Sequence, residues 1–160
     1  MSYHIPVLLK QSVEGLNIQA GGIYVDVTFG GGGHSRSIFE QMEHGTLIAF
    51  DQDPDASRNT TSFESDAQRS FIFVPSNFRH LKRYLKFHKI DKVDGILADL
   101  GVSSHQFDQQ SRGFSTRFDG ALDMRMNQVS AITAAKVVNE YSEEDLIQLL
   151  SRYGEIINAK

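Results

Sequence analysis

Short apolar runs alternate with amphipathic segments along the first hundred residues of the chain. Four of the runs are rich in β-branched or aromatic residues and are bounded by Gly, Pro or polar residues, and they cover residues 23–28, 46–50, 71–74 and 93–98. This composition and length predict buried β-strands. Apolar positions at helical spacing predict helices over 34–43 and 79–92 and a short helix from about Pro54.

Strands that alternate with helices in this way form βαβ units. The pattern therefore predicts a doubly wound, Rossmann-like α/β fold with a parallel sheet covered on both faces. Beyond Asp99 the pattern changes. Residues 103–128 predict a long ordered loop, and helices follow over 130–140 and 142–152, where Ser142 to Asp145 resembles a capping box. We place a core domain at 1–108 and a loop with the start of a helical domain at 109–160.

Composition narrows the class of protein. The 160 residues suit one ordinary domain, and 40% hydrophobic with 22% charged residues is typical of soluble globular proteins. No apolar run approaches the ~20 residues of a membrane span, and residues 1–15 do not match a signal peptide. The chain has no cysteine, which fits a reducing compartment. We therefore expect a cytoplasmic protein without membrane contact.

Charge is unevenly distributed. The formal net charge is −4, yet residues 79–92 carry six Lys and Arg residues against the single acid Asp91. One interpretation is a solvated helix face, and the other is a patch that faces phosphates. The apolar residues within the segment, Leu81, Tyr84, Leu85 and Phe87, are expected on the core side of the helix.

Four consecutive glycines, Gly30 to Gly33, lie between the first predicted strand and its helix. This turn falls at the carboxyl edge of the sheet, where open α/β sheets bind ligands. A loop without side chains lets a ligand approach the backbone, and the helix start offers N–H groups to an anion. The spacing matches neither G-x-G-x-x-G, since Ser35 and Arg36 stand where glycine is needed, nor a P-loop. A merely tight turn is the alternative.

Two acids end predicted strands at the same edge. Asp51 follows the second strand, 18 positions after Gly33, where a carboxylate can accept hydrogen bonds from ribose hydroxyls. Asp99 follows the fourth strand. Each could instead be a cap or turn former. Together with the glycines they predict a site for an adenosine-containing cofactor with an anionic group. His34 lacks a second histidine at metal-binding spacing, so we expect no metal site.

Several longer motifs resemble the bacterial 16S ribosomal RNA cytosine-N4 methyltransferases, the MraW/RsmH family. They occur in the family's order, and "DLGVSS" with "LDMRM" is the most specific pair. The motifs are "HIPVLL" at 4–9, "YVDVTFGGGGHS" at 24–35, "AFDQDPDA" at 49–56, "VDGILADLGVSSHQFD" at 93–108, "RGFS" at 112–115, "LDMRM" at 122–126 and "YGE" at 153–155.

The resemblance implies S-adenosylmethionine as cofactor and a methyltransferase fold. It implies binding by residues that match the family's site: Gly32, Gly33, His34, Asp51, Phe78, Asp99 and Gln106. In this arrangement the loop holds the methionine carboxylate, and Asp51 binds the ribose. Phe78 either covers the adenine or belongs to the ordinary core. Asp99 lies near the sulfonium or the methionine amine and is the candidate catalytic residue.

The resemblance also implies a substrate, the exocyclic N4 amine of a cytidine in 16S rRNA of the small ribosomal subunit. Methylation at C5 normally uses a cysteine nucleophile, which this chain lacks, whereas an amine needs only acceptors that orient it. The target base must be unpaired or flipped out. Arg112, Arg117 and Arg125 are candidates either for phosphate contacts or for structural ion pairs.

Other interpretations stay open. The family's chains are longer, and a complete sheet of this class has more strands than the four found here. We therefore expect this chain to be the N-terminal part of such an enzyme, and it is either active or inactive by itself. Its sheet should have an exposed apolar edge, which favours association. A non-catalytic nucleotide- or RNA-binding module is the alternative. An NAD-dependent oxidoreductase is disfavoured by the glycine spacing.

Overall fold

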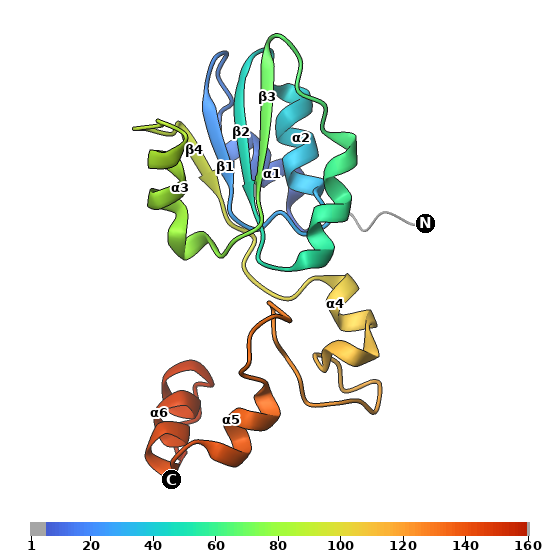
Figure 1. Ribbon diagram of the computed structural model, residues 1–160, viewed down its shortest axis with the longest axis vertical. Coiled ribbons are helices and arrows are strands. Elements are labelled where there is room, and N and C mark those ends of the chain that lie inside the picture. The colour runs from blue at the N-terminus through green and yellow to red at the C-terminus, as the bar shows by residue number, and fades with distance from the viewer. Residues whose placement is uncertain (1–5, 160) are drawn as a thin grey trace. The chain divides into compact units, whose positions relative to one another are not determined.

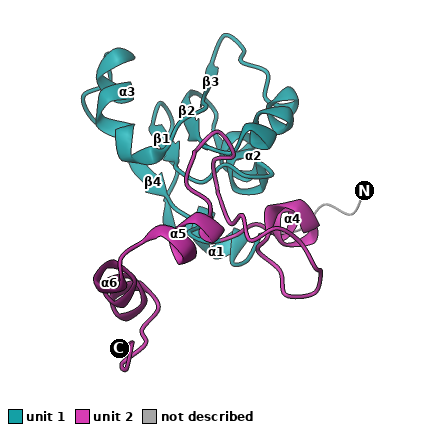
Figure 2. Ribbon diagram, turned by 60° about the horizontal axis from the view of Figure 1, so that its bottom comes forward, with its two compact units in different colours: residues 1–101 teal, residues 102–160 magenta. Residues whose placement is uncertain are grey.

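A computed structural model describes residues 6–159 (Figure 1). The chain divides into two compact units, one ending at Gly101 and one beginning at Val102 (Figure 2). The sequence analysis placed a boundary after residue 108, so the described division assigns helix α4 (Ser104–Asp108) to the second unit. The first two residues of the "HIPVLL" motif lie outside the described residues.

The first unit is built on a four-stranded parallel sheet in the order β3-β2-β1-β4. The four predicted strands are confirmed, although β1 ends two residues earlier than expected and β4 is shorter than expected at both ends. Their bounds are Ile23–Asp26 for β1, Gly45–Phe50 for β2, Arg69–Val74 for β3 and Gly95–Leu97 for β4. β4 forms one edge of the sheet, as expected, and Ile96 within it is about half exposed.

Helices cover both faces of this sheet, which confirms the Rossmann-like α/β prediction (Figure 1). On one face α1 (Leu9–Gly15) and α2 (Gly33–Gln41) pack over Tyr24, Leu47 and Ala49. On the other face α3 (Leu81–Phe87) packs over residues of alternate register that include Val25 and Ile48. Successive strand residues point to opposite faces, so both faces of β1 and β2 are buried.

Some elements differ from the prediction. α1 was not predicted, and Val13 alone anchors it as a buried residue. The segment from Pro54 is a 3₁₀ helix over Pro54–Ser62, capped by Asp53. The predicted basic helix ends at Phe87, because Lys89 has a positive φ of 59°. The placement of Phe87 on the core side is wrong: its side chain is 77% exposed.

The second unit contains three helices and an irregular loop. The segment 103–128, predicted as loop, begins with α4 and a 3₁₀ helix over Gln110–Arg112 and is otherwise irregular. The two C-terminal helices are confirmed as α5 (Ala134–Glu140) and α6 (Glu143–Tyr153). Ser142 caps α6 by accepting a hydrogen bond from the Asp145 N–H, as its sequence suggested. Among the helices of residues 6–159, none has the length and apolar character that a membrane crossing requires.

Candidate functional site

The glycine run forms the turn between β1 and α2, and its members differ in what they do. Gly30 and Gly32 have φ values of 51° and 77°, in the left-handed region that favours glycine. A Cβ on Gly32 would also lie 3.0 Å from the Phe29 ring and 3.3 Å from the Phe63 ring. Gly31, in contrast, is exposed, and a Cβ there would meet nothing within 4 Å. Backbone shape therefore explains Gly30 and Gly32 but leaves Gly31 unexplained.

The first turn of α2 follows directly. Gly33 begins the helix beside Pro6, whose Cγ would be 2.5 Å from a Cβ at this position. Within residues 6–159, the backbone N–H groups of Gly31, Gly33 and His34 receive no hydrogen-bond acceptor. Unbonded N–H groups at a helix start carry partial positive charge and attract anions.

Asp51 lies at the tip of β2 and contacts this loop. Its Oδ2 accepts a hydrogen bond of 2.7 Å from the Gly30 N–H, and its Oδ1 accepts one of 2.8 Å from the Asp53 N–H. Burial raises the pKa of the Asp51 carboxyl, while the backbone hydrogen bonds oppose that shift. Each carboxylate oxygen keeps a lone pair beyond these two bonds. Asp51 thus both shapes the loop and retains acceptor capacity for a ligand.

Asp26, at the end of β1, is a site residue that the sequence analysis missed. Its fully buried carboxylate accepts a hydrogen bond of 2.7 Å from the Ser35 hydroxyl and one of 3.0 Å from the Thr28 N–H. Burial raises the pKa of this carboxyl. The contacts fasten the strand end to the first turn of α2. The sequence did contain a signal for Asp26, because an acid within an apolar strand, nine residues before a serine in the following helix, indicates a buried and bonded carboxylate.

Asp99 follows β4 and is tied to the same tip. Its backbone N–H donates to the Thr28 Oγ1 over 2.7 Å, while its side chain is mostly exposed. The His34 Nδ1 lies 3.9 Å from the Asp99 Oδ2. The imidazole itself is buried, and its Nε2 has no partner among the described residues. The candidate catalytic carboxylate therefore lies beside the start of α2 and faces solvent.

Phe78 opens the short 3₁₀ helix Phe78–His80 that follows β3. Its side chain is 42% exposed, so the interpretation as ordinary core does not hold. The preceding residue, Asn77, donates a hydrogen bond of 2.9 Å to the Gln52 Oε1 beyond the tip of β2. This bond holds the β3 and β2 tips together at the carboxyl edge.

Gln106 is the one predicted site residue in the second unit. It is buried at the start of α4, where its Oε1 accepts a hydrogen bond from the Ser103 N–H and its own N–H donates to the Ser103 Oγ. This reciprocal pair is a capping box. The other six predicted residues lie at the carboxyl edge of the first unit's sheet.

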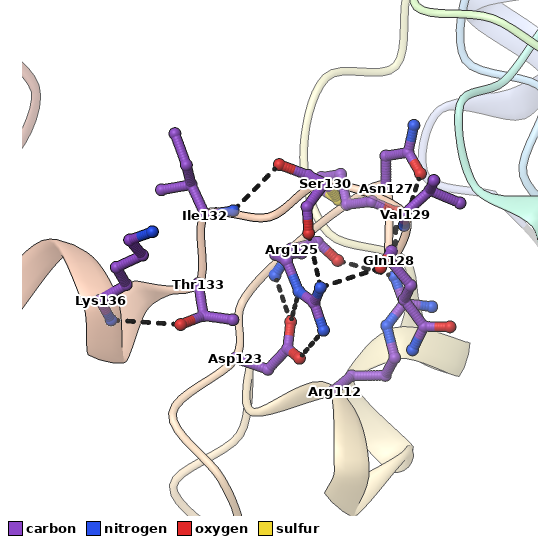
Figure 3. A network of polar contacts seen from close by, with 11 residues as sticks. Arg112, Asp123, Arg125, Asn127, Gln128, Val129, Ser130, Ile132, Thr133 and Lys136 are labelled. Carbon is purple, nitrogen blue, oxygen red and sulfur yellow. Dashed lines mark hydrogen bonds and ion pairs between the residues drawn. The ribbon is translucent and has the colours of Figure 1, made fainter.

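The arginines of the second unit organise its loop (Figure 3). Arg112 is buried and donates from Nη2 to the carbonyls of Arg125 and Met126 over 3.0 and 3.1 Å. The Arg125 guanidinium forms a bidentate ion pair with Asp123, at 2.8 and 2.6 Å. For Arg112 and Arg125 these contacts favour the structural interpretation over phosphate binding. Arg117, 63% exposed and paired with Asp108, is consistent with either.

The sheet, the glycine turn and the acidic strand tips define a Rossmann-like α/β protein whose binding edge suits an adenosine cofactor. The sequence profile of the MraW methylase family matches residues 1–160. The chain belongs to the MraW methylase family, which is a family with an S-adenosylmethionine-dependent methyltransferase fold. The resemblance and the fold class predicted from the sequence are thereby confirmed.

Named relatives agree with this assignment. The chain is 56% identical over 158 residues to a ribosomal RNA small subunit methyltransferase H of Cytophaga hutchinsonii, covering 99% of this chain and 52% of the relative. Proteins of the same name match at 56% in Bacteroides thetaiotaomicron and at 57% in Flavobacterium johnsoniae, each covered over 51% of its length. The chain thus spans about half the length of the curated relatives it matches.

Proposed function

We propose that this chain is the cofactor-binding part of an S-adenosylmethionine-dependent methyltransferase that modifies the N4 amine of a cytidine in 16S rRNA of the small ribosomal subunit. The observation that carries the proposal is the glycine turn set between two acidic strand tips in a chain of the MraW methylase family. Ribosomal RNA as substrate places the activity in the cytoplasm.

The residues at the carboxyl edge fit such a cofactor. Gly31 is exposed with open space above it, and the neighbouring N–H groups are unbonded within residues 6–159. The loop and the start of α2 would hold the methionine carboxylate, and Asp51 would accept the ribose hydroxyls. The exposed ring of Phe78 would cover the adenine. When bound, S-adenosylmethionine supplies the activated methyl group.

The chain's own contribution to the reaction is positioning. An exocyclic amine must be aligned behind the methyl group, and alignment alone supplies much of a rate enhancement. The Asp99 carboxylate is exposed and faces solvent beside His34. We assign to this carboxylate the role of the hydrogen-bond acceptor that orients the N4 amine and takes a proton from the amine. The cytosine must be flipped out of any base pair for this contact.

Calorimetry tests the cofactor assignment. We expect S-adenosylhomocysteine to bind and NAD not to bind. Asp51→Ala removes charged hydrogen bonds worth about 1.5–3 kcal/mol each, so the affinity should fall roughly 10- to 100-fold. The matched control is Asp91→Ala, which removes an exposed acid that precedes β4, at the amino ends of the strands. Thermal unfolding of each variant separates lost binding from lost folding, and unchanged affinity in folded Asp51→Ala contradicts the ribose role.

A non-catalytic nucleotide-binding module is the second candidate, because the contact between Asp51 and the glycine turn serves binding whether or not transfer follows. Transfer of a labelled methyl group to small-subunit particles distinguishes the two. We expect transfer by a full-length relative and compare this chain beside it. Binding of S-adenosylhomocysteine without transfer by either protein would favour the module.

A further inference from the structure

The outer surface of α3 carries a stripe of cations. Lys82, Arg83 and Lys86 lie on α3, and Arg79 lies in the 3₁₀ helix directly before it. Lys82 and Arg83 each stand three or four positions from Arg79 and from Lys86, which places the four on one side of the helical segment. All four are exposed, and we call them the basic face. The residues between them, Leu81, Tyr84 and Leu85, pack against the sheet. The helix is thus oriented with its cations toward solvent.

The basic face lacks acidic partners. Within residues 6–159, none of its four cations forms an ion pair with a carboxylate, whereas Lys10 pairs with Glu14 in α1 and Lys136 with Glu140 in α5. Like charges at this spacing destabilise a helix by a few tenths of a kcal/mol per pair. The helix retains this unneutralised charge although the whole chain has a net charge of −4.

An aromatic surface adjoins these charges. Phe87, expected on the core side, is 77% exposed. It lines a hollow together with Arg83 and Tyr84, while the Tyr84 ring contacts Phe50 of the core edge-on at 5.8 Å. The exposed Phe87 ring, next to the anchored Tyr84 ring and the Arg83 guanidinium, offers both components that recognise a nucleotide, a stacking surface for the base and a cation for the phosphate.

The basic face begins close to the proposed cofactor site. α3 follows the 3₁₀ helix of Phe78 at the carboxyl edge and runs back along the sheet (Figure 1). The Asn77–Gln52 hydrogen bond fixes this start to the tip of β2, next to Asp51. A nucleic-acid chain bound along α3 would therefore approach the edge of the sheet where the methyl group would be transferred.

We propose that the basic face and the Arg83–Tyr84–Phe87 hollow bind single-stranded RNA flanking the target base, with phosphates on the cations and a base against Phe87. The inference rests on the proposed function for its choice of nucleic acid. A membrane surface does not fit, because the apolar side of α3 is occupied by the sheet. Single-stranded RNA fits better than a duplex, since only unstacked bases expose their faces to an aromatic ring.

The test measures binding of a labelled single-stranded oligocytidine to the 160-residue chain at several salt concentrations. In the triple variant K82Q/R83Q/K86Q the slope of log K against log salt should become shallower by about 0.7 for each phosphate that is no longer neutralised, roughly 2 in total. Phe87→Ala should weaken binding about fivefold or more without changing that slope. K10Q/K136Q, which removes two paired cations, is the matched control and should leave both quantities unchanged.

The inference would be overturned by no binding of the unsubstituted chain, by an unchanged salt slope in the triple variant, or by equal binding of duplex RNA with no effect of Phe87→Ala. Binding of an acidic polypeptide in preference to the oligocytidine would also overturn it. Calorimetry with S-adenosylhomocysteine on the same proteins keeps the two claims apart. Cofactor binding with an unchanged RNA slope refutes this surface alone, and an altered RNA slope without cofactor binding refutes the proposed function alone.

Discussion

The carboxyl edge of the first unit and the loop of the second unit treat charge in opposite ways. At the carboxyl edge of the first unit, Asp26 and Asp51 are held by backbone N–H groups and a serine hydroxyl, with no guanidinium or ammonium group bonded to them in the described residues. In the loop of the second unit, Arg112 and Arg125 are bonded to carbonyls and to the Asp123 carboxylate. Asp26 and Asp51 are hydrogen-bonded to neutral groups, whereas the cations of the second region hold its loop together.

The pKa values follow the same division. Burial raises the pKa of Asp26 and Asp51, whereas hydrogen bonding to Arg125 lowers the pKa of Asp123. The Asp51 carboxylate, which no cation among residues 6–159 matches, can accept a hydrogen bond from a ligand, whereas the Arg125 guanidinium donates from all three nitrogens to protein acceptors and has little left for a phosphate. Residue type alone therefore does not identify a binding site, because the partners of a side chain decide which of its donors or acceptors remain for a ligand.

The largest expected effect is on the second unit. Arg112→Met leaves two carbonyls without their donor and should destabilise the loop by roughly 2–4 kcal/mol. Hydrogen exchange of residues 112–130 measures it. Arg117→Met, at an exposed ion pair, should cost no more than about 0.5 kcal/mol. If Arg112→Met instead leaves exchange unchanged and weakens RNA binding, the structural role assigned to Arg112 is refuted.

Next in size is the contrast between neighbouring glycines of the turn. Gly32→Ala places a Cβ against two rings at a positive φ and should lower the free energy of unfolding by roughly 1–3 kcal/mol. Gly31→Ala meets open space and should leave stability nearly unchanged while weakening S-adenosylhomocysteine binding. Urea unfolding and calorimetry on both variants measure this. Full affinity in Gly31→Ala would show that the cofactor does not lie over that residue.

The smallest effects concern pH. The pKa of Asp26 is raised above its unfolded value of 3.8, so the wild type loses stability as pH rises from 3.8 through the folded pKa. Asp26→Asn does not titrate there, so its free energy of unfolding should rise relative to that of the wild type over the same pH range. The pKa of Asp123 is lowered, so its contribution is present above 3.8 and is lost as pH falls through the folded pKa.

The loss of unfolding free energy caused by Asp123→Asn should therefore shrink as pH falls. For Asp26→Asn the trend is opposite, since its advantage over the wild type grows as pH rises. Unfolding free energies of the three proteins across pH 2–7 measure both trends (the range brackets roughly the ordinary carboxyl pKa values). Parallel curves for the two variants would erase the distinction drawn between the regions.

The sequence was informative where local chemistry decides structure. Apolar runs rich in β-branched or aromatic residues, bounded by Gly, Pro or polar residues, identified all four strands, and the positions of Asp51 and Asp99 followed from strand ends. α1 could not be read in this way, because its residues Leu9–Gly15 are mostly polar and its order depends on Val13 packing under the sheet. Tertiary contact, absent from any local pattern, stabilises that helix.

The sequence predicted the candidate site less completely than it predicted the fold. Asp26 was hidden within an apolar strand, because a buried acid is recognisable only once its partners Ser35 and Thr28 are placed around it. At Ser103 and Gln106 a signal was present, since their spacing is that of a capping box, the same device recognised at Ser142. The exposure of Phe87 depended on where α3 ends, which its composition did not indicate.

The Thr28 hydroxyl has a consequence for the order in which this edge assembles. Asp26 and Ser35 are nine positions apart, so the glycine turn can close early by local chain motion, whereas Thr28 and Asp99 are 71 positions apart. Asp99 reaches the turn only after β4 has paired with β1, and β4 is a three-residue edge strand. Transient fraying of that strand would detach the proposed catalytic carboxylate while the turn stays folded, so we expect the proposed activity to be lost first at β4 on warming.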